Sequence, residues 1–291
     1  MQHIKLNKND SQLISLALRE DLGEPYCDIT ANTLFAGEQQ TGTVKVISKH
    51  PTDIICCGLP LVSAIMSHFD CDVNITPHCK DGDTVKKGDA LFLLSGPQQY
   101  LSMAERTILN FMQHLSGIAT LTHEFVKRVS HTDAKILDTR KTLPGFRHLD
   151  KYAVQCGGGV NHRMGLYDAI MIKDTHVDLL GGIKNTLDKL PNTILNQCPV
   201  ILEIRSIDEL RVALSEDKPK ITRVLLDNMS LSELRECVAL CKNKLPTEAS
   251  GGVNVDSVSS IAETGVDFIS IGMLTHSAGT VDLSMKAAQH D

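Results

Sequence analysis

Charged or glycine-containing segments follow each of the short apolar runs in the second half of the chain. Strand ends on protein surfaces are often polar, and this tendency alone would explain a charged residue or a glycine after one or two of the runs. It does not explain why such residues follow every run. We therefore read them as a candidate active site built from cations, two carboxylates and two small-residue loops. Its residues are Thr139, Arg140 and Lys141 after AKILD, Lys173 after AIMI, Glu203 after PVIL, Asp227 after RVLL, the loop Ser250, Gly251 and Gly252, and the loop Ser270, Ile271 and Gly272, in which Gly272 follows FISI.

Positive charge is concentrated in residues 138–176. Six Lys or Arg stand against four Asp there, a net charge of +2, which leaves −8 for the rest of the chain. Three histidines, His148, His162 and His176, lie in the same segment. A local cluster of positive charges on an otherwise acidic protein indicates a pocket for a small anion with several charges. The run CGGGVNHR supports this reading over a solvated loop, because consecutive glycines let the backbone approach a ligand closely.

The two late glycine loops are candidate phosphate sites. Each follows a strand-like run near the end of the chain and precedes a helical pattern. Barrel enzymes commonly bind phosphate at such positions through backbone amides and a helix N-terminus. Neither loop matches a Walker A or a dinucleotide-binding motif, so the prediction rests on the two loops together.

Glu203 and Asp227 leave several roles open. They could form an acid/base pair, bind Mg²⁺, or accept hydrogen bonds from sugar hydroxyls. Mg²⁺ favours one or two carboxylates completed by substrate phosphates and water, which fits this pair. Their types and spacing do not separate the three roles.

The elements that must position these residues alternate between strand and helix. Strand-like runs recur at intervals of 22 to 35 residues, and capping boxes at Ser206–Glu209 and Ser230–Glu233 mark helix starts between them. This alternation predicts parallel strands with crossover helices. We expect an α/β barrel of six or seven strands, open where it falls short of eight; a doubly wound open sheet is the alternative.

The first half of the chain has a different pattern. It begins with a helical stretch at Ser11–Glu20, continues with an alternating strand at Thr41–Lys49, and contains the turn-rich run DGDTVKKGDALF. A long helical pattern follows through Leu101 and Leu115, and we expect Gly117 to interrupt it. These features predict an N-terminal α+β sandwich domain over residues 1–115, a catalytic barrel over 116–275 and a segment, 276–291, that returns to the first domain.

Composition narrows the class of protein. The formal net charge of −6 argues against nucleic acid as a partner. The longest apolar run, at residues 54–66, is too short for a membrane span, and the first residues lack a signal-peptide pattern. Nine cysteines in no zinc or disulfide spacing are expected to be reduced, with Cys237 and Cys241 as buried filler on a helix. We expect a cytoplasmic protein.

The segment DTRKTLPGFRHLDKYAVQCGGGVNHRMGLYDAIMIKDTH closely resembles the signature of quinolinate phosphoribosyltransferases. ALREDLG followed by DIT, AERTILNFMQHLSGIAT, LEI, LLDNM, EASGGV and SIGMLTHS occur in the order and spacing of that family. The resemblance covers nearly the whole chain. It implies transfer of phosphoribosyl from phosphoribosyl pyrophosphate to quinolinate with decarboxylation, in a Mg²⁺-dependent homodimer with shared active sites that can assemble further into a hexamer.

The resemblance also implies roles for individual residues. Lys141, Glu203 and Asp227 would be catalytic, with Lys141, joined by Lys173, at the pyrophosphate and the two carboxylates at the ribose and its Mg²⁺. The 5′-phosphate would bind at Ser250–Gly252 and Gly272. The residues implied around the quinolinate carboxylates are Thr139, Arg140, His162, Arg163 and Lys173, joined by Arg106 from the neighbouring subunit, while His276 would lie near the pyrophosphate.

Some positions depart from the family pattern, namely Thr175, Arg205 and the stretch Glu24–Cys27, but none is an implied ligand. Three alternative functions stay open at this stage. A nicotinate phosphoribosyltransferase would need to hold one carboxylate rather than two. A Schiff-base aldolase could use Lys141 or Lys173. A lipoyl-like or biotinyl-like carrier is suggested by DGDTVKKGDALF, although Lys86 and Lys87 are not in a modification-like motif.

Overall fold

The computed structural model describes residues 4–35, 40–215 and 220–288. The chain divides into two compact units. Unit 1 comprises residues 1–123, 142–158 and 275–291, and unit 2 comprises residues 124–141 and 159–274. The two units are described separately.

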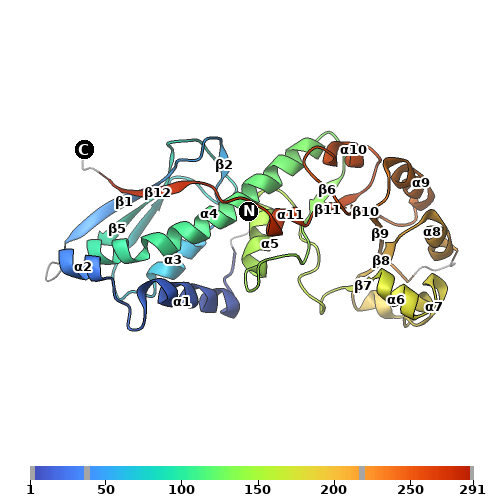
Figure 1. Ribbon diagram of the computed structural model, residues 1–291, viewed down its shortest axis with the longest axis horizontal. Helices are drawn as coiled ribbons and strands as arrows, with labels where there is room; N and C mark the ends of the chain where they lie inside the picture. Colours follow the sequence, from blue (N-terminus) through green and yellow to red (C-terminus); the bar gives the residue numbers. More distant parts are fainter. Residues whose placement is uncertain (1–3, 36–39, 216–219, 289–291) are drawn as a thin grey trace. The chain divides into compact units, whose positions relative to one another are not determined.

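Unit 1 contains a four-stranded antiparallel sheet in the order β12-β1-β5-β3 and a two-stranded sheet of β2 and β4. In Figure 1, β12 lies beside β1, so residues from the two ends of the sequence are neighbours in one sheet. The strands are β1 (Thr41–Ser48), β2 (Ile54–Ile55), β3 (Asn74–Pro77), β4 (Thr84–Val85), β5 (Ala90–Pro97) and β12 (Leu283–Ala287). The helices are α1 (Lys8–Leu22), α2 (Ile29–Leu34), α3 (Leu59–Met66), α4 (Gln98–Val129, which ends in unit 2) and α5 (Arg147–Cys156).

The expected break at Gly117 is wrong, because α4 runs unbroken from Gln98 to Val129. A Cβ atom at Gly117 would lie 2.0 Å from the backbone oxygen of Gly279. Residues 279–280 therefore pack so close to the helix that only glycine fits at this position. Glycine lowers helix propensity by about 1 kcal/mol, which is too little to break a helix of this length. Polar side chains of α4 also bind the neighbouring segments: Ser116 Oγ accepts a hydrogen bond from Cys57 N at 3.0 Å.

Unit 2 is a curved parallel sheet of six strands in the order β6-β11-β10-β9-β8-β7. A single bridge between Leu137 and Val160 extends it beyond β6. The strands are β6 (Lys135–Leu137), β7 (Ile170–Ile172), β8 (Val200–Ile204), β9 (Arg223–Asp227), β10 (Thr247–Ser250) and β11 (Phe268–Ser270). The helices are α6 (Asp174–Leu179), α7 (Ile183–Asp188), α8 (Ile207–Leu214), α9 (Leu231–Cys241), α10 (Val258–Ala262) and α11 (Met273–His276, which ends in unit 1), with a 3₁₀ turn, η1 (Ile194–Asn196).

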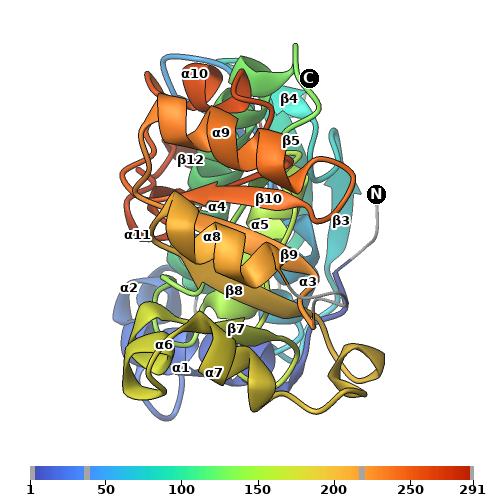
Figure 2. The same cartoon turned by 90° about the vertical axis from the view of Figure 1, so that its right-hand side faces the viewer.

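This topology confirms the expected open α/β barrel. Strands β7 to β11 follow one another around the sheet in chain order, and Figures 1 and 2 show helices α6 to α10 along its outer side. A doubly wound sheet would reverse its strand order and carry helices on both faces, so that alternative is wrong.

Helix starts follow the capping signals with one difference. Ser230 and Glu233 form the expected reciprocal capping box at α9. At α8, Ser206 accepts a hydrogen bond from Glu209 N, but the Glu209 carboxylate binds Arg205 N at 2.8 Å instead of completing the box. Arg205 also pairs with Asp178 at 2.9 Å, so this departure from the family pattern supports a surface ion-pair network.

Candidate active site

Strand register places the polar residues of unit 2 on one face of the sheet. Ser250 lies opposite Asp227 on one side and Ser270 on the other. Glu203 is opposite Leu225, two residues before Asp227, so the two carboxylates share that face. The alternate residues, including Leu202 and Leu226, are buried on the opposite, helix-covered face. The alternation thus separates an apolar packing face from a polar inner face at the carboxyl ends of the strands.

Lys173 and Glu203 form an ion pair at this end of the sheet. Lys173 directly follows β7 and Glu203 lies in β8, the adjacent parallel strand. The Glu203 carboxylate is buried, whereas the Lys173 side chain is partly exposed. The structure therefore brings together two predicted site residues that are thirty positions apart in the sequence.

Arg140 and Arg163 carry neighbouring positive charges. Burial lowers the pKa of Arg163, and the charge of Arg140 lowers it further. The Arg163 guanidinium is held by a hydrogen bond of 3.1 Å from Nη1 to the backbone oxygen of Ala169. Arg140 and Arg163 thus concentrate positive charge, offset in part by the nearby Asp168 carboxylate, which is the arrangement expected of a site for an acidic ligand.

His162 is buried and engaged by protein groups on both sides of its ring. Nδ1 accepts a hydrogen bond of 2.7 Å from Arg163 N, so a neutral ring carries its proton on Nε2. Nε2 lies 3.3 Å from Oε1 of Glu248. The His162 backbone N–H donates to Asp138 Oδ1 at 2.8 Å. Through its backbone and its side chain, His162 thereby links the strand-end segment at Asp138, the backbone of Arg163 and the barrel interior.

Glu248 is a site residue that the sequence analysis missed. Its carboxylate is fully buried, accepts a hydrogen bond of 2.5 Å from Ser270 Oγ and lies 3.2 Å from Arg223 Nη1. Burial alone would raise the pKa of Glu248, but the hydrogen bond and charge of His162, the charge of Arg223 and the bond from Ser270 together lower it. The available signal was a carboxylate inside the short strand TEAS, two residues before Ser250 and therefore on the same face.

The loop after β10 has the backbone geometry of a close-approach site. Gly251 has φ of +100° and Gly252 has φ of +59°. A Cβ atom at Gly251 would lie 2.2 Å from Asn228 Oδ1, whereas nothing lies within 4 Å of one at Gly252. Both glycines are exposed, so their backbone is available to a ligand.

The other predicted residues lie at the same strand ends or in unit 1. Thr139 and Lys141 follow β6, and Lys141 N donates to Thr139 Oγ1 at 3.0 Å. Ile271 N donates to Leu137 O at 2.9 Å, which ties the start of the Ser270–Gly272 loop to β6. Arg106 is exposed on α4, and the exposed His276 has Nδ1 2.5 Å from Ser277 Oγ.

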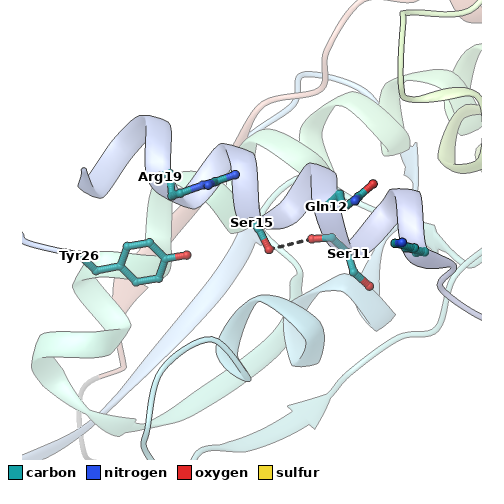
Figure 3. A pocket seen from close by; sticks show the side chains of 6 residues that line it. Ser11, Gln12, Ser15, Arg19 and Tyr26 are labelled. Atoms are coloured by element: carbon teal, nitrogen blue, oxygen red, sulfur yellow. Dashed lines mark hydrogen bonds between the residues drawn. The ribbon is translucent and has the colours of Figure 1, made fainter. Parts of the chain in front are cut away.

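A surface hollow of about 450 Å³ lies elsewhere, along α1 in unit 1 (Figure 3). It is lined by Lys8, Ser11, Gln12, Ser15, Arg19 and Tyr26. Ser15 Oγ donates to Ser11 O within the helix at 3.0 Å, as the dashed line in Figure 3 marks. None of the residues singled out for chemistry lines this hollow.

Comparison with known proteins agrees with this arrangement. Residues 28–116 match the family model described as the quinolinate phosphoribosyl transferase N-terminal domain, and residues 118–286 match that of the C-terminal domain. The chain belongs to the quinolinate phosphoribosyltransferase family. The two matches together span most of both units, and the second one contains every candidate site residue except Arg106.

Individual relatives of this family are similar over nearly their full length. The probable nicotinate-nucleotide pyrophosphorylase (carboxylating) of Bacillus subtilis is 38% identical over 285 residues, covering 98% of this chain and 94% of the relative. The solved nicotinate-nucleotide pyrophosphorylase of Francisella tularensis is 36% identical with a TM-score of 0.87, covering 99% and 100% of the two chains. That of Ehrlichia chaffeensis is 37% identical with a TM-score of 0.88, covering 98% and 100%.

Proposed function

We propose that the chain transfers the phosphoribosyl group of phosphoribosyl pyrophosphate to quinolinate, releasing pyrophosphate and CO₂ and yielding nicotinate mononucleotide for NAD biosynthesis. The observation that carries this proposal is the pair of neighbouring guanidinium groups, Arg140 and Arg163, in a chain of this family. Guanidinium groups bind carboxylates with two parallel hydrogen bonds, so two of them suit a dicarboxylate.

The pyridine nitrogen of quinolinate is itself the nucleophile, so the protein needs no activated serine or cysteine. Arg140 and Arg163 hold the two carboxylates and orient the ring toward C1 of the sugar. As pyrophosphate leaves, positive charge develops on the ribose, and Glu203 and Asp227 stabilise it. Lys141 offsets the charge on the leaving pyrophosphate. Attack at C1 forms the bond from the ring nitrogen to the sugar as the C1–oxygen bond to pyrophosphate breaks. Loss of the 2-carboxylate as CO₂ leaves an electron pair on ring C2, which takes a proton from solvent.

The loops after β10 and β11 bind the 5′-phosphate in this scheme. Gly251 and Gly252 present an exposed backbone, and Ser250 adds a hydroxyl group on the inner face, whereas the Ser270 hydroxyl donates to Glu248 and holds the start of its loop. His276 assists at the pyrophosphate. Anchoring the far end of the substrate holds C1 in place for in-line attack, which lowers the entropic part of the barrier.

Mg²⁺ is part of this proposal, and the donor set fits it. Glu203 and Asp227 offer two carboxylates on one face of adjacent strands, and the remaining oxygen ligands of Mg²⁺ would come from substrate phosphates and water. Because Glu203 is already paired with Lys173, Asp227 is the stronger direct ligand of the two. When bound, Mg²⁺ would supply charge neutralisation at the pyrophosphate.

His162 supports the site indirectly in our proposal. The family resemblance implies a contact with quinolinate, but Nδ1 already accepts the Arg163 N–H and Nε2 faces Glu248. Offering either nitrogen to a substrate would break one of these contacts. We therefore assign His162 and Glu248 to the positioning of Arg163.

The alternative reactions fit these contacts less well. The Lys173 side chain is engaged in an ion pair with Glu203, whereas a Schiff base would need its nitrogen free to attack a carbonyl carbon. A nicotinate-specific enzyme would have no use for two adjacent guanidinium groups at the acid-binding end of its pocket.

The decisive assay mixes the purified chain with quinolinate, phosphoribosyl pyrophosphate and Mg²⁺ and measures pyrophosphate and CO₂ together. We expect equal amounts of both products, loss of turnover on chelation of Mg²⁺, and very poor turnover of nicotinate. Comparable turnover of nicotinate and quinolinate would contradict the assignment.

We also propose that the enzyme acts as a homodimer with shared active sites, to which Arg106 of each subunit contributes across the interface. Arg106 is an exposed cation of unit 1, and the family resemblance implies that it serves the neighbouring subunit. In a two-fold dimer the same contact occurs twice. Further assembly into a hexamer would leave this pairing unchanged.

Subunit mixing tests the shared site. Inactive Arg106→Ala and inactive Lys141→Ala protein are combined and allowed to exchange subunits. In a mixed dimer one site carries both lesions and the other carries neither, so random pairing restores roughly a quarter of all sites. Activity that stays at the single-variant level, with exchange verified by mass spectrometry, would rule out shared sites.

The place of action we propose is the cytoplasm. All nine cysteines are free thiols, which suits a reducing compartment. In the part of the chain that the structure describes, no helix has the length and apolar character needed to cross a membrane. Fractionation of cells producing the protein would test this location.

A further inference from the structure

Two cysteines and one carboxylate from distant parts of the sequence meet inside unit 1. Cys57 lies between β2 and α3, Asp81 between β3 and β4, and Cys156 at the end of α5. Their ligand atoms, two sulfurs and a carboxylate oxygen, all lie within 4.8 Å of one another. Each of the three residues is more than nine-tenths buried. None of them has a part in the proposed reaction.

The Asp81 carboxylate is held rigidly by backbone and side-chain donors. Gly58 N donates to Oδ2 at 3.0 Å and Leu59 N donates to Oδ1 at 3.1 Å, which caps the start of α3. Tyr152 of α5 donates its hydroxyl proton to Oδ2 at 2.7 Å. Oδ1 keeps a lone pair that meets only a weak S–H contact, 3.9 Å from Cys56 Sγ. Such outer contacts fix the direction of a metal-binding carboxylate.

Contacts with α4 hold the backbone of the segments that carry the two sulfurs. Ser116 Oγ of α4 accepts from Cys57 N at 3.0 Å and donates to Cys57 O at 3.2 Å. Cys156 ends a helix whose next residue, Gly157, packs so closely that a Cβ there would lie 2.4 Å from Ala119 O of α4. Both sulfurs are thus presented by segments that α4 fixes in place.

We propose that Cys57, Asp81 and Cys156 form a binding site for a thiophilic divalent cation of the zinc type. Zinc binds sulfur at about 2.3 Å and carboxylate oxygen at about 2.0–2.2 Å, which puts two ligands of one tetrahedral ion roughly 3.5–4 Å apart. Because the ligand atoms lie within 4.8 Å of one another, they would have to approach by at most about 1.3 Å to reach that spacing. Two sulfurs and one oxygen select this class of ion over Mg²⁺, which requires oxygen ligands.

Binding is a simple exchange of protons for the ion. Each thiol loses one proton as its sulfur binds the cation, so one M²⁺ enters and two H⁺ leave. Three protein ligands leave a fourth position for water. An ion in this position would tie the end of α5 to the start of α3, and its role would be structural within unit 1.

Cadmium is a suitable probe because thiolate ligation gives it an ultraviolet charge-transfer band. The full-length chain, reduced with a phosphine in metal-free buffer, is titrated with Cd²⁺ while the band and the bound metal are measured. We expect one tightly bound Cd²⁺ per chain with the band of two thiolates, and a Cd²⁺-dependent rise in Tm.

Variants decide where the cation binds. Cys57→Ala and the size-conserving Cys156→Ser should each remove the band and weaken binding at least tenfold, since loss of even an outer contact costs about that much. Cys237→Ala/Cys241→Ala is the matched control, because it removes two buried thiols of α9 and should leave binding unchanged. Circular dichroism establishes that each variant is folded.

Three results would overturn the proposal. One is folded wild-type protein that shows no charge-transfer band. Another is a band of wild-type strength in folded Cys156→Ser. The third is loss of the band in Cys79→Ala with retention in Cys57→Ala, which would place cadmium at the neighbouring Cys56 and Cys79 thiols instead.

Discussion

Replacing Gly251 by alanine should damage the loop after β10 far more than the same change at Gly252, although the two glycines are adjacent. At Gly251 the φ of +100° lies beyond the left-handed region of about +50° to +70° that L-residues can adopt. The new Cβ would also lie 2.2 Å from Oδ1 and 3.0 Å from the backbone N of Asn228. At Gly252 the φ of +59° is within that region and the space is open.

The contacts of Asn228 set the size of the effect. Its side chain donates to Asp227 Oδ2 at 2.8 Å, and its backbone N donates to Ser250 O at 2.9 Å. Displacing the side chain loses a hydrogen bond to a charged group, worth about 1.5–3 kcal/mol. The left-handed backbone adds about 1–2 kcal/mol for alanine at either position. The total is about 2.5–5 kcal/mol at Gly251 and about 1–2 kcal/mol at Gly252.

Kinetics with phosphoribosyl pyrophosphate as the varied substrate measure the outcome. If the Gly251 loop binds the 5′-phosphate, the roughly 1.5–3 kcal/mol lost at Asn228 acts on the position of that loop, so Gly251→Ala should lower kcat/KM for this substrate about 10- to 100-fold, at about 1.4 kcal/mol for each factor of ten. The backbone strain should lower the stability of the folded protein instead. KM for quinolinate should change much less. Gly252→Ala should keep kcat/KM within about threefold and lower Tm by only a few degrees. Equal effects at the two positions, or an unchanged kcat/KM in Gly251→Ala, would refute this reasoning.

Three further predictions concern other parts of the chain. Lys141→Ala should lower turnover about 10²-fold or more, which is the loss expected on removal of one preorganised transition-state contact. A steady-state rate within twofold of wild type would show that Lys141 is only a surface charge without a catalytic role. Gly117→Ala should lower the free energy of unfolding by about 1–3 kcal/mol because its Cβ would meet Gly279 O, while Gly279→Ala, with open space, should be nearly neutral in the same urea titration. Glu248→Gln should lower stability by about 2 kcal/mol at neutral pH. The pKa of Glu248 is lower in the folded protein than in the unfolded chain, where it is about 4.3. The stability difference between wild type and Glu248→Gln should therefore be complete above about pH 4.3 and vanish as the pH falls through the folded pKa. A difference in urea unfolding that does not depend on pH would contradict this prediction.

The barrel could be predicted because its signals are local. Most strands are short apolar runs, serine caps mark the helices after β8 and β9, and a residue such as Asp227 or Lys173 is placed by the end of its own run. Parallel pairing then brings consecutive strand ends together without further information. The Lys173–Glu203 contact is the direct result of two strand ends that lie in adjacent strands.

The missed features depend on contacts between distant segments. Gly117 looked like a helix break because a glycine lowers helix propensity, and only the approach of residue 279 explains why it is tolerated. Cys57, Asp81 and Cys156 show no recognisable spacing because three separate elements bring them together. Glu248 was overlooked because its ion-pair partners, His162 and Arg223, are distant in the sequence, and the sequence alone does not show that they surround this carboxylate.

The pairing of β12 with β1 has a consequence for how the protein is made. Unit 1 is completed by residues 275–291, which leave the ribosome only after all of unit 2 has been synthesised. Until then β1, already paired with β5, would present an open strand edge along Val44–Ser48, where β12 will add. Exposed edges of this kind pair readily with other chains. The interval between synthesis of β1 and of β12 is therefore the period in which a nascent chain is most prone to aggregate, and a chaperone that shields this edge would act there.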